Sequence, residues 1–148
     1  TETSIGRGTT SVSHSAVDMA TDHLGTLAGR RVLVCGAGEM GKGIVVSLVG
    51  AGANDVTVTN RTESRARELA DSVGGRVVPF AELPSALAAA DVLLACTGSG
   101  GVLIDREMLA EARAGIDSPL LVVDIAVPRD VAADVVSLPG VTLLNLDD

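Results

Sequence analysis

The sequence contains no Trp, no Tyr and a single Phe among its 148 residues. Its apolar content of 47% therefore comes mainly from Val, Leu, Ile and Ala, and the core must be aliphatic. Basic residues are also scarce, since 11 Lys and Arg face 19 Asp and Glu, for a formal net charge of -8. Nucleic-acid binders rely on clustered cations and on aromatic side chains that stack on bases. Both shortages argue against nucleic acid as a direct ligand of this chain.

Long hydrophobic runs are missing too. No apolar run approaches the roughly 18 to 20 residues that a membrane-spanning helix needs, and no basic segment followed by a hydrophobic one opens the chain. We therefore expect a soluble, cytoplasmic protein with no membrane partner. Cys35 and Cys96 each end a hydrophobic run, without the spacing of a metal site or a disulfide framework. Both are predicted to be core residues, and no metal is expected.

Apolar residues recur at helical spacing from Val12 to Leu24, which predicts a short amphipathic helix within an N-terminal segment, residues 1–28. The rest, residues 29–148, is predicted to be one domain of alternating strands and helices. Strands are expected at 32–35, 56–59, 77–78, 92–96, 120–125 and 141–146, and helices up to about 49, at 63–73, at 83–90 and from a cap at Asp105 to about 113. This order predicts an α/β fold, namely a Rossmann-like doubly wound parallel sheet in three αβα layers.

A glycine-rich turn directly follows the first predicted strand and opens a helix. It has the spacing Gly-x-Gly-x-x-Gly and consists of Gly36, Ala37, Gly38, Glu39, Met40 and Gly41. The first glycine permits the tight turn, the second lets the backbone approach a pyrophosphate, and the third lets helix and strand pack closely. The free N–H groups of the helix N-terminus form an anion site, and Glu39 is expected to point away from it. We predict dinucleotide binding here, with a purely structural turn as the weaker alternative.

The end of the second predicted strand distinguishes NADP from NAD. NAD binders place an acidic residue there to accept from the ribose 2′-OH, whereas this chain has Asn60, Arg61 and Thr62. The Arg61 guanidinium suits a 2′-phosphate, and Thr62 is expected to cap the following helix and add donors. Arg65 lies one helical turn further on and is either a second phosphate ligand or a solvated arginine. The predicted cofactor is therefore NADP(H).

Two further strand ends should open onto the same crevice, because ligands of open α/β sheets lie across the carboxyl ends of the strands. The small residues Thr97, Gly98 and Ser99 are predicted to let a ribose or a nicotinamide approach, with a plain loop as the alternative. Ile125, Ala126 and Val127 are predicted to form an apolar floor under the nicotinamide ring. Asp124 is interpreted as a buried carboxylate that backbone N–H groups satisfy.

Residues 32–41, 60–62, 90–99, 104–109 and 123–130 together closely resemble glutamyl-tRNA reductase, and the resemblance covers nearly the whole chain. It implies an enzyme that uses NADPH to reduce glutamyl-tRNA to glutamate-1-semialdehyde in tetrapyrrole biosynthesis. In that family a separate N-terminal domain supplies a cysteine nucleophile, and a C-terminal helical domain makes a homodimer. The resemblance thus implies that this chain binds NADPH without turnover, while other domains bind glutamyl-tRNA. Neither cysteine matches the nucleophile, and no catalytic residue is predicted here.

Two other hypotheses stay open. The NADP-binding domain of a shikimate-type dehydrogenase shares Asn-Arg-Thr but usually carries further small residues where this chain has Glu39 and Met40. A non-catalytic nucleotide-sensing module generally keeps the acidic residue that this chain lacks. Because the chain starts at Thr1 without a methionine and stops at Asp148 after an apolar run, we expect a piece of a longer protein.

Overall fold

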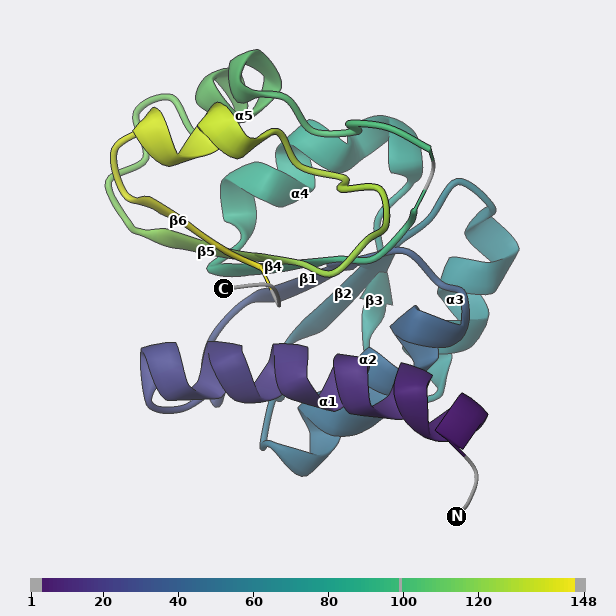
Figure 1. The fold of residues 1–148 in the computed structure, drawn as a ribbon. Coiled ribbons are helices and arrows are strands. Elements are labelled where there is room, and N and C mark those ends of the chain that lie inside the picture. The colour runs from purple at the N-terminus through teal and green to yellow at the C-terminus, as the bar shows by residue number, and fades with distance from the viewer. Residues whose placement is uncertain (1–3, 99, 146–148) are drawn as a thin grey trace.

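A computed structural model describes residues 4–98 and 100–145, with side chains described from residue 11 onward. A six-stranded sheet lies between two layers of helices (Figure 1). Its strands are β1 (Val32–Cys35), β2 (Val56–Thr59), β3 (Arg76–Val77), β4 (Val92–Ala95), β5 (Leu120–Asp124) and β6 (Val141–Asn145). The helices are α1 (Ser4–Leu24), α2 (Glu39–Gly50), α3 (Glu63–Asp71), α4 (Leu83–Ala89) and α5 (Arg106–Ala112), with short 3-10 turns η1 (Phe80–Glu82) and η2 (Ala133–Ser137).

The strand order is β3-β2-β1-β4-β5-β6, and every pairing is parallel. This confirms the predicted Rossmann-like doubly wound sheet. Strands β1, β4 and β5 are buried along their whole length, as expected for continuous apolar runs covered on both faces. The chain reverses its direction of winding between β1 and β4, which opens a crevice at their carboxyl ends.

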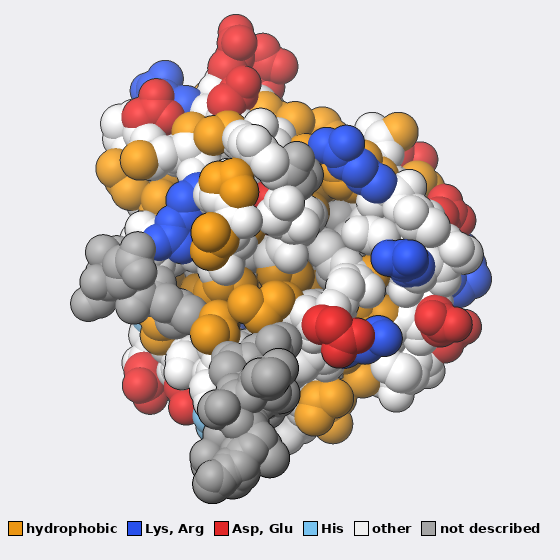
Figure 2. Space-filling model, turned by 45° about the vertical axis from the view of Figure 1, so that its right-hand side comes forward, with side chains coloured by type: hydrophobic (Ala, Val, Ile, Leu, Met, Phe, Trp, Pro, Cys, Tyr) orange, Lys and Arg blue, Asp and Glu red, His pale blue; other side chains and the backbone are white. Residues whose placement is uncertain are grey.

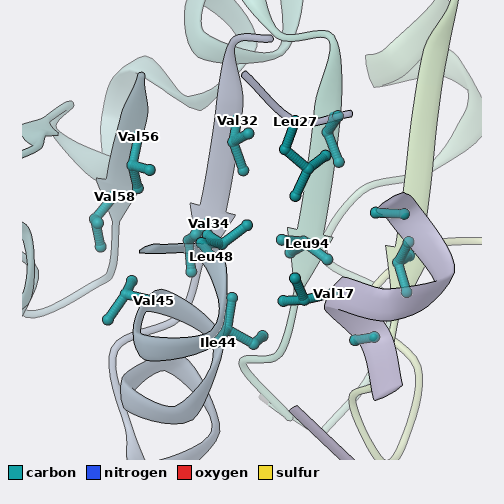
Figure 3. Packing of buried hydrophobic residues seen from close by; sticks show 14 of the residues in the cluster. Val17, Leu27, Val32, Val34, Ile44, Val45, Leu48, Val56, Val58 and Leu94 are labelled. Carbon is teal, nitrogen blue, oxygen red and sulfur yellow. The ribbon is translucent and has the colours of Figure 1, made fainter. Parts of the chain in front are cut away.

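Aliphatic side chains fill the space on both sides of the sheet. On one side, Ile44, Val45 and Leu48 of α2 pack against the strands together with α1 and α3, as Figure 3 shows in part. On the other side, α4, α5 and η2 cover the second cluster, which includes Leu87 and Leu109. The three-layer arrangement therefore follows from helices that each bury one apolar stripe.

Helix α1 is longer than the apolar periodicity predicts, because it begins at Ser4. Its residues Ala16, Val17 and Ala20 are buried in the same core as α2. The two helices approach so closely at Gly43 that a Cβ there would lie 2.6 Å from the Ser13 hydroxyl oxygen. Helix α1 therefore packs directly against α2. The division of the chain into a segment 1–28 and a domain 29–148 stays a prediction.

Most predicted boundaries agree with the structure to within one or two residues. Asp105 caps α5 as predicted, since its carboxylate accepts from the Met108 N–H at 2.8 Å. The turns η1 and η2 were not predicted, because three to five residues carry no readable periodicity. Within the residues described, no helix has both the length and the apolar character needed to cross a bilayer.

Candidate cofactor site

A cleft of about 390 Å³ lies at the carboxyl ends of the central strands. It brings together three segments that the sequence analysis singled out, which follow β1, β2 and β4. The residues that line it are Gly36, Ala37, Gly38, Glu39, Met40, Asn60, Arg65, Cys96 and Thr97. The predicted ligand crevice is therefore a real cavity of the fold.

Two of the three glycines in the turn are required by the packing. Gly36 has φ +122°, and a Cβ there would lie 2.9 Å from the Cys96 sulfur and 3.1 Å from its carbonyl oxygen. At Gly41 a Cβ would lie 2.5 Å from the carbonyl oxygen of Gly36. A side chain at Gly36 would clash with Cys96 after β4, and a side chain at Gly41 would force α2 away from the turn. These contacts agree with the roles that the sequence predicts for both residues.

Gly38 differs from its two neighbours, because a Cβ there would meet no atom within 4 Å. It is the N-cap residue of α2, and no side chain caps this end of the helix. The first N–H groups of a helix have no partner inside it, so this end carries partial positive charge. Together, an open space and an uncapped helix N-terminus form a place where an anion can contact the backbone directly.

The two residues after Gly38 also line the cleft. Glu39 forms an exposed ion pair with Lys42 at 3.4 Å, so its carboxylate is engaged along the helix surface. Met40 is half-buried against the core, and its carbonyl oxygen accepts a hydrogen bond from the Ser13 hydroxyl at 3.1 Å. Helix α1 is thereby hydrogen-bonded to the first turn of α2.

The guanidinium groups of two arginines near the cleft make no hydrogen bond and no ion pair within the described part of the chain. They are Arg61, whose guanidinium lies over the Phe80 ring at 5.4 Å from the centroid, and Arg65, which lines the cleft. The other arginines with described side chains all have polar partners; these are Arg30, Arg31, Arg67, Arg76, Arg106, Arg113 and Arg129. These two guanidinium groups thus have no polar partner among the described residues. Arg61 follows β2 and Arg65 lies in the first turn of α3, in the region where the sequence predicts a 2′-phosphate.

Asn60 and Thr62 shape the turn that carries Arg61. The Asn60 side-chain amide donates to the Thr62 carbonyl oxygen at 3.1 Å. Thr62 occupies the N-cap position of α3, as predicted, but its hydroxyl makes no capping hydrogen bond. Because the hydroxyl does not cap the helix, the N-terminal N–H groups of α3 form a second uncapped helix end beside the cleft.

Thr97 is held in the cleft wall by a buried aspartate that the sequence analysis did not identify. Asp130 is fully buried, and its carboxylate accepts from the Thr97 N–H at 2.7 Å and from the Thr97 hydroxyl at 2.5 Å. The bonds join the loop after β4 to the loop after β5. A contact across 33 residues leaves no signal in local patterns. Gly98 has φ +56°, and Ser99 lies outside the described residues.

Asp124 is a buried carboxylate that the backbone satisfies, as the sequence analysis interpreted it. It accepts from the N–H groups of Ala126, Asp130 and Val131 at 2.9 to 3.1 Å. Burial raises the pKa of Asp124, and the three N–H groups act against that shift. Asp124 therefore fixes the loop that carries Asp130 and is not exposed to a ligand.

The three residues predicted to lie under the nicotinamide do not line the cleft. Ile125 and Ala126 are buried, whereas Val127 is 86% exposed. A Cβ at Gly98 would lie 3.5 Å from the Val127 carbonyl oxygen, so the two loops are adjacent. Contact between Ile125, Ala126 or Val127 and a cofactor stays a prediction.

Neither cysteine has the environment of a nucleophile. Burial raises the pKa of the Cys35 thiol to about 12. Burial also raises the pKa of Cys96, whose thiol donates to the Cys35 carbonyl oxygen at 3.4 Å. Cys96 nevertheless lines the cleft, which its place at the end of an apolar run did not reveal. Within the described residues no group of three His, Cys, Asp or Glu could hold a metal ion.

Comparisons with known proteins identify the family of this chain. The sequence matches the family described as Shikimate / quinate 5-dehydrogenase over residues 18–148. It is 44% identical over 148 residues to glutamyl-tRNA reductase from Priestia megaterium, covering 99% of this chain and 33% of that protein. The chain thus spans about a third of the length of the curated relatives it matches.

Solved structures give the same result. Glutamyl-tRNA reductase from Methanopyrus kandleri is similar with a TM-score of 0.83 and 42% identity, over 93% of this chain and 35% of that one. Shikimate dehydrogenase from Mycobacterium tuberculosis is similar with a TM-score of 0.59 and 28% identity, over 92% of this chain and 51% of that one. The chain therefore belongs to the shikimate/quinate 5-dehydrogenase family, and its predicted resemblance to the glutamyl-tRNA reductases is confirmed over almost its entire length.

Proposed function

We propose that this chain is the NADPH-binding domain of a glutamyl-tRNA reductase, which reduces glutamyl-tRNA to glutamate-1-semialdehyde in tetrapyrrole biosynthesis. The observation that carries the proposal is the combination of two features at one edge of the sheet. The uncapped N-terminus of α2 and the open space at Gly38 face the cleft, which Arg65 of α3 also lines. Arg61 follows β2 next to the cleft residue Asn60. A dinucleotide with an extra phosphate carries anionic groups suited to both.

Each part of the cofactor has candidate ligands among the residues in the cleft or next to it in the chain. The backbone of the turn from Gly36 to Gly41 would hold the diphosphate, and Arg61 and Arg65 would hold the 2′-phosphate. Thr97, fixed by Asp130, would orient the nicotinamide half from the opposite wall. Bound NADPH supplies a hydride, and the residues of this chain bind and orient it.

The rest of the reaction is assigned to other parts of a longer protein. With raised thiol pKa values, Cys35 and Cys96 are poor candidates for a thioester-forming nucleophile. Figure 2 shows one face of the molecule, on which the coloured Lys and Arg side chains are separated from one another and interspersed with Asp and Glu. The chain as a whole has a net charge of -8. We assign binding of the tRNA and formation of a homodimer to regions outside this chain, in a cytoplasmic enzyme.

The alternative substrate is shikimate, because the matching family carries that name. We expect the longer protein that contains this chain to oxidise NADPH only when glutamyl-tRNA is present, and not to reduce NADP+ with shikimate. Absorbance at the reduced nicotinamide band measures both reactions. Reduction of NADP+ with shikimate, or reduction of glutamyl-tRNA without oxidation of NADPH, would contradict the proposal.

A further inference from the structure

The only aromatic side chain among Phe, Trp and Tyr in this protein contacts the residue that is expected to bind the 2′-phosphate. Phe80 begins η1, three residues after the end of β3, and the Arg61 guanidinium carbon lies 5.4 Å above the centre of its ring. Such a distance is within the range of cation–π attraction. No polar group of the described residues competes for Arg61.

Strand pairing brings these two residues together. β2 and β3 run parallel with Val58 opposite Val77, and the Val78 N–H continues the ladder by donating to the Val58 carbonyl oxygen at 3.1 Å. The segment after β3 is therefore fastened beside the end of β2. Phe80 itself is half-buried and packs against the aliphatic cluster under α4 and α5. The ring is thus anchored to the core and presents a fixed surface to an exposed arginine.

We propose that Phe80 is a specificity-determining residue, which holds the Arg61 guanidinium ready for the 2′-phosphate and so favours NADPH over NADH. This inference rests on the proposed cofactor function. An exposed arginine that nothing holds must lose the rotational freedom of its side chain when it binds a ligand. A guanidinium held over a ring has lost much of that freedom in advance, and N–H groups directed away from the ring stay available to a phosphate. Arg65 has no such support.

The test is calorimetric titration of this chain with NADPH and with NADH. Phe80→Leu keeps an apolar side chain against the core but removes the ring. We expect it to weaken NADPH about three- to tenfold, the usual effect of ordering one long side chain, and to change NADH less than about twofold. Phe80→Tyr keeps the ring and should restore the wild-type affinity. In an Arg61→Ala background, Phe80→Leu should change NADPH affinity less than about twofold, because the residue it supports is gone.

A second measurement keeps the test independent of any loss of stability. In NMR spectra of the wild type, the side-chain resonances of Arg61 should show a ring-current shift, and Phe80→Leu should abolish it. An equal loss of NADPH and NADH affinity in Phe80→Leu would assign the ring a structural role only and overturn the inference. So would an unchanged Arg61 spectrum, or an unchanged effect in the Arg61→Ala background. A wild-type chain that shows no preference for NADPH would instead remove the proposed function, and this inference with it.

Discussion

Replacing Gly38 by Ala is expected to leave the protein folded and to weaken NADPH binding by roughly five- to a hundredfold, the equivalent of about 1 to 3 kcal/mol of overpacking. The backbone of Gly38 has φ -84° and ψ -155°, values that an alanine can adopt. The added methyl group meets no protein atom within 4 Å, and Gly38 lines the cleft that the diphosphate should fill. Because alanine is a poorer N-cap than glycine, unfolding free energy should fall by no more than about 1 kcal/mol.

Two other glycines of α2 serve as controls for this prediction. Gly50→Ala also adds a methyl group in open space, but away from the cleft, and should leave both stability and NADPH affinity close to wild type. Gly41→Ala places its Cβ 2.5 Å from the Gly36 carbonyl oxygen and should destabilise the fold itself. Fluorescence titration and urea unfolding separate the three results. Wild-type NADPH affinity in Gly38→Ala would show that no diphosphate approaches this turn.

Replacing Asp130 by Ala is expected to lower the free energy of unfolding by about 2 to 4 kcal/mol, because two hydrogen bonds to a buried carboxylate disappear and leave Thr97 donors without partners. NADPH affinity should fall as well, since Thr97 lines the cleft. Asp130→Asn should cost less than half as much. An asparagine amide can still accept from the Thr97 N–H and can donate to its hydroxyl oxygen.

Thr97→Val provides the matched control, since it removes only the hydroxyl bond and keeps the shape of the side chain and its N–H bond. The free energy of unfolding of Thr97→Val should therefore lie between that of the wild type and that of Asp130→Ala. Urea unfolding monitored by circular dichroism measures all three variants. Equal stability of Asp130→Ala and the wild type would mean that the bond between the two loops does not support the cleft.

The fold was largely predictable because each central strand is a short, continuous apolar run between turn residues. Such runs at 32–35, 92–95 and 120–124 leave few alternatives to a buried parallel sheet. The glycine turn was equally predictable, since the positive φ of Gly36 and the close contact at Gly41 follow from the spacing of the motif. The contact between Gly36 and Cys96 was not predictable, because it joins segments 60 residues apart. The start of α1 at Ser4 was not, because helix formation there does not follow the apolar periodicity that begins near Val12.

The site was only partly predictable, because several of its contacts join distant segments. Asp130 reaches Thr97 across 33 residues, and Phe80 meets Arg61 only because β3 pairs with β2. Local patterns describe single elements and carry no information on such pairs. Asp124 could be interpreted correctly from its position alone, since a carboxylate inside an apolar strand end needs backbone donors.

Titration of the wild-type chain with NADPH and NADH tests the central claim most directly, with Arg61→Ala measured alongside. The charge-assisted bonds of Arg61 to the 2′-phosphate should make NADPH bind roughly ten- to a hundredfold more tightly than NADH. Arg61→Ala should weaken NADPH and leave NADH nearly unchanged. A preference for NADH, binding of neither cofactor, or an equal loss of both in Arg61→Ala would contradict the account.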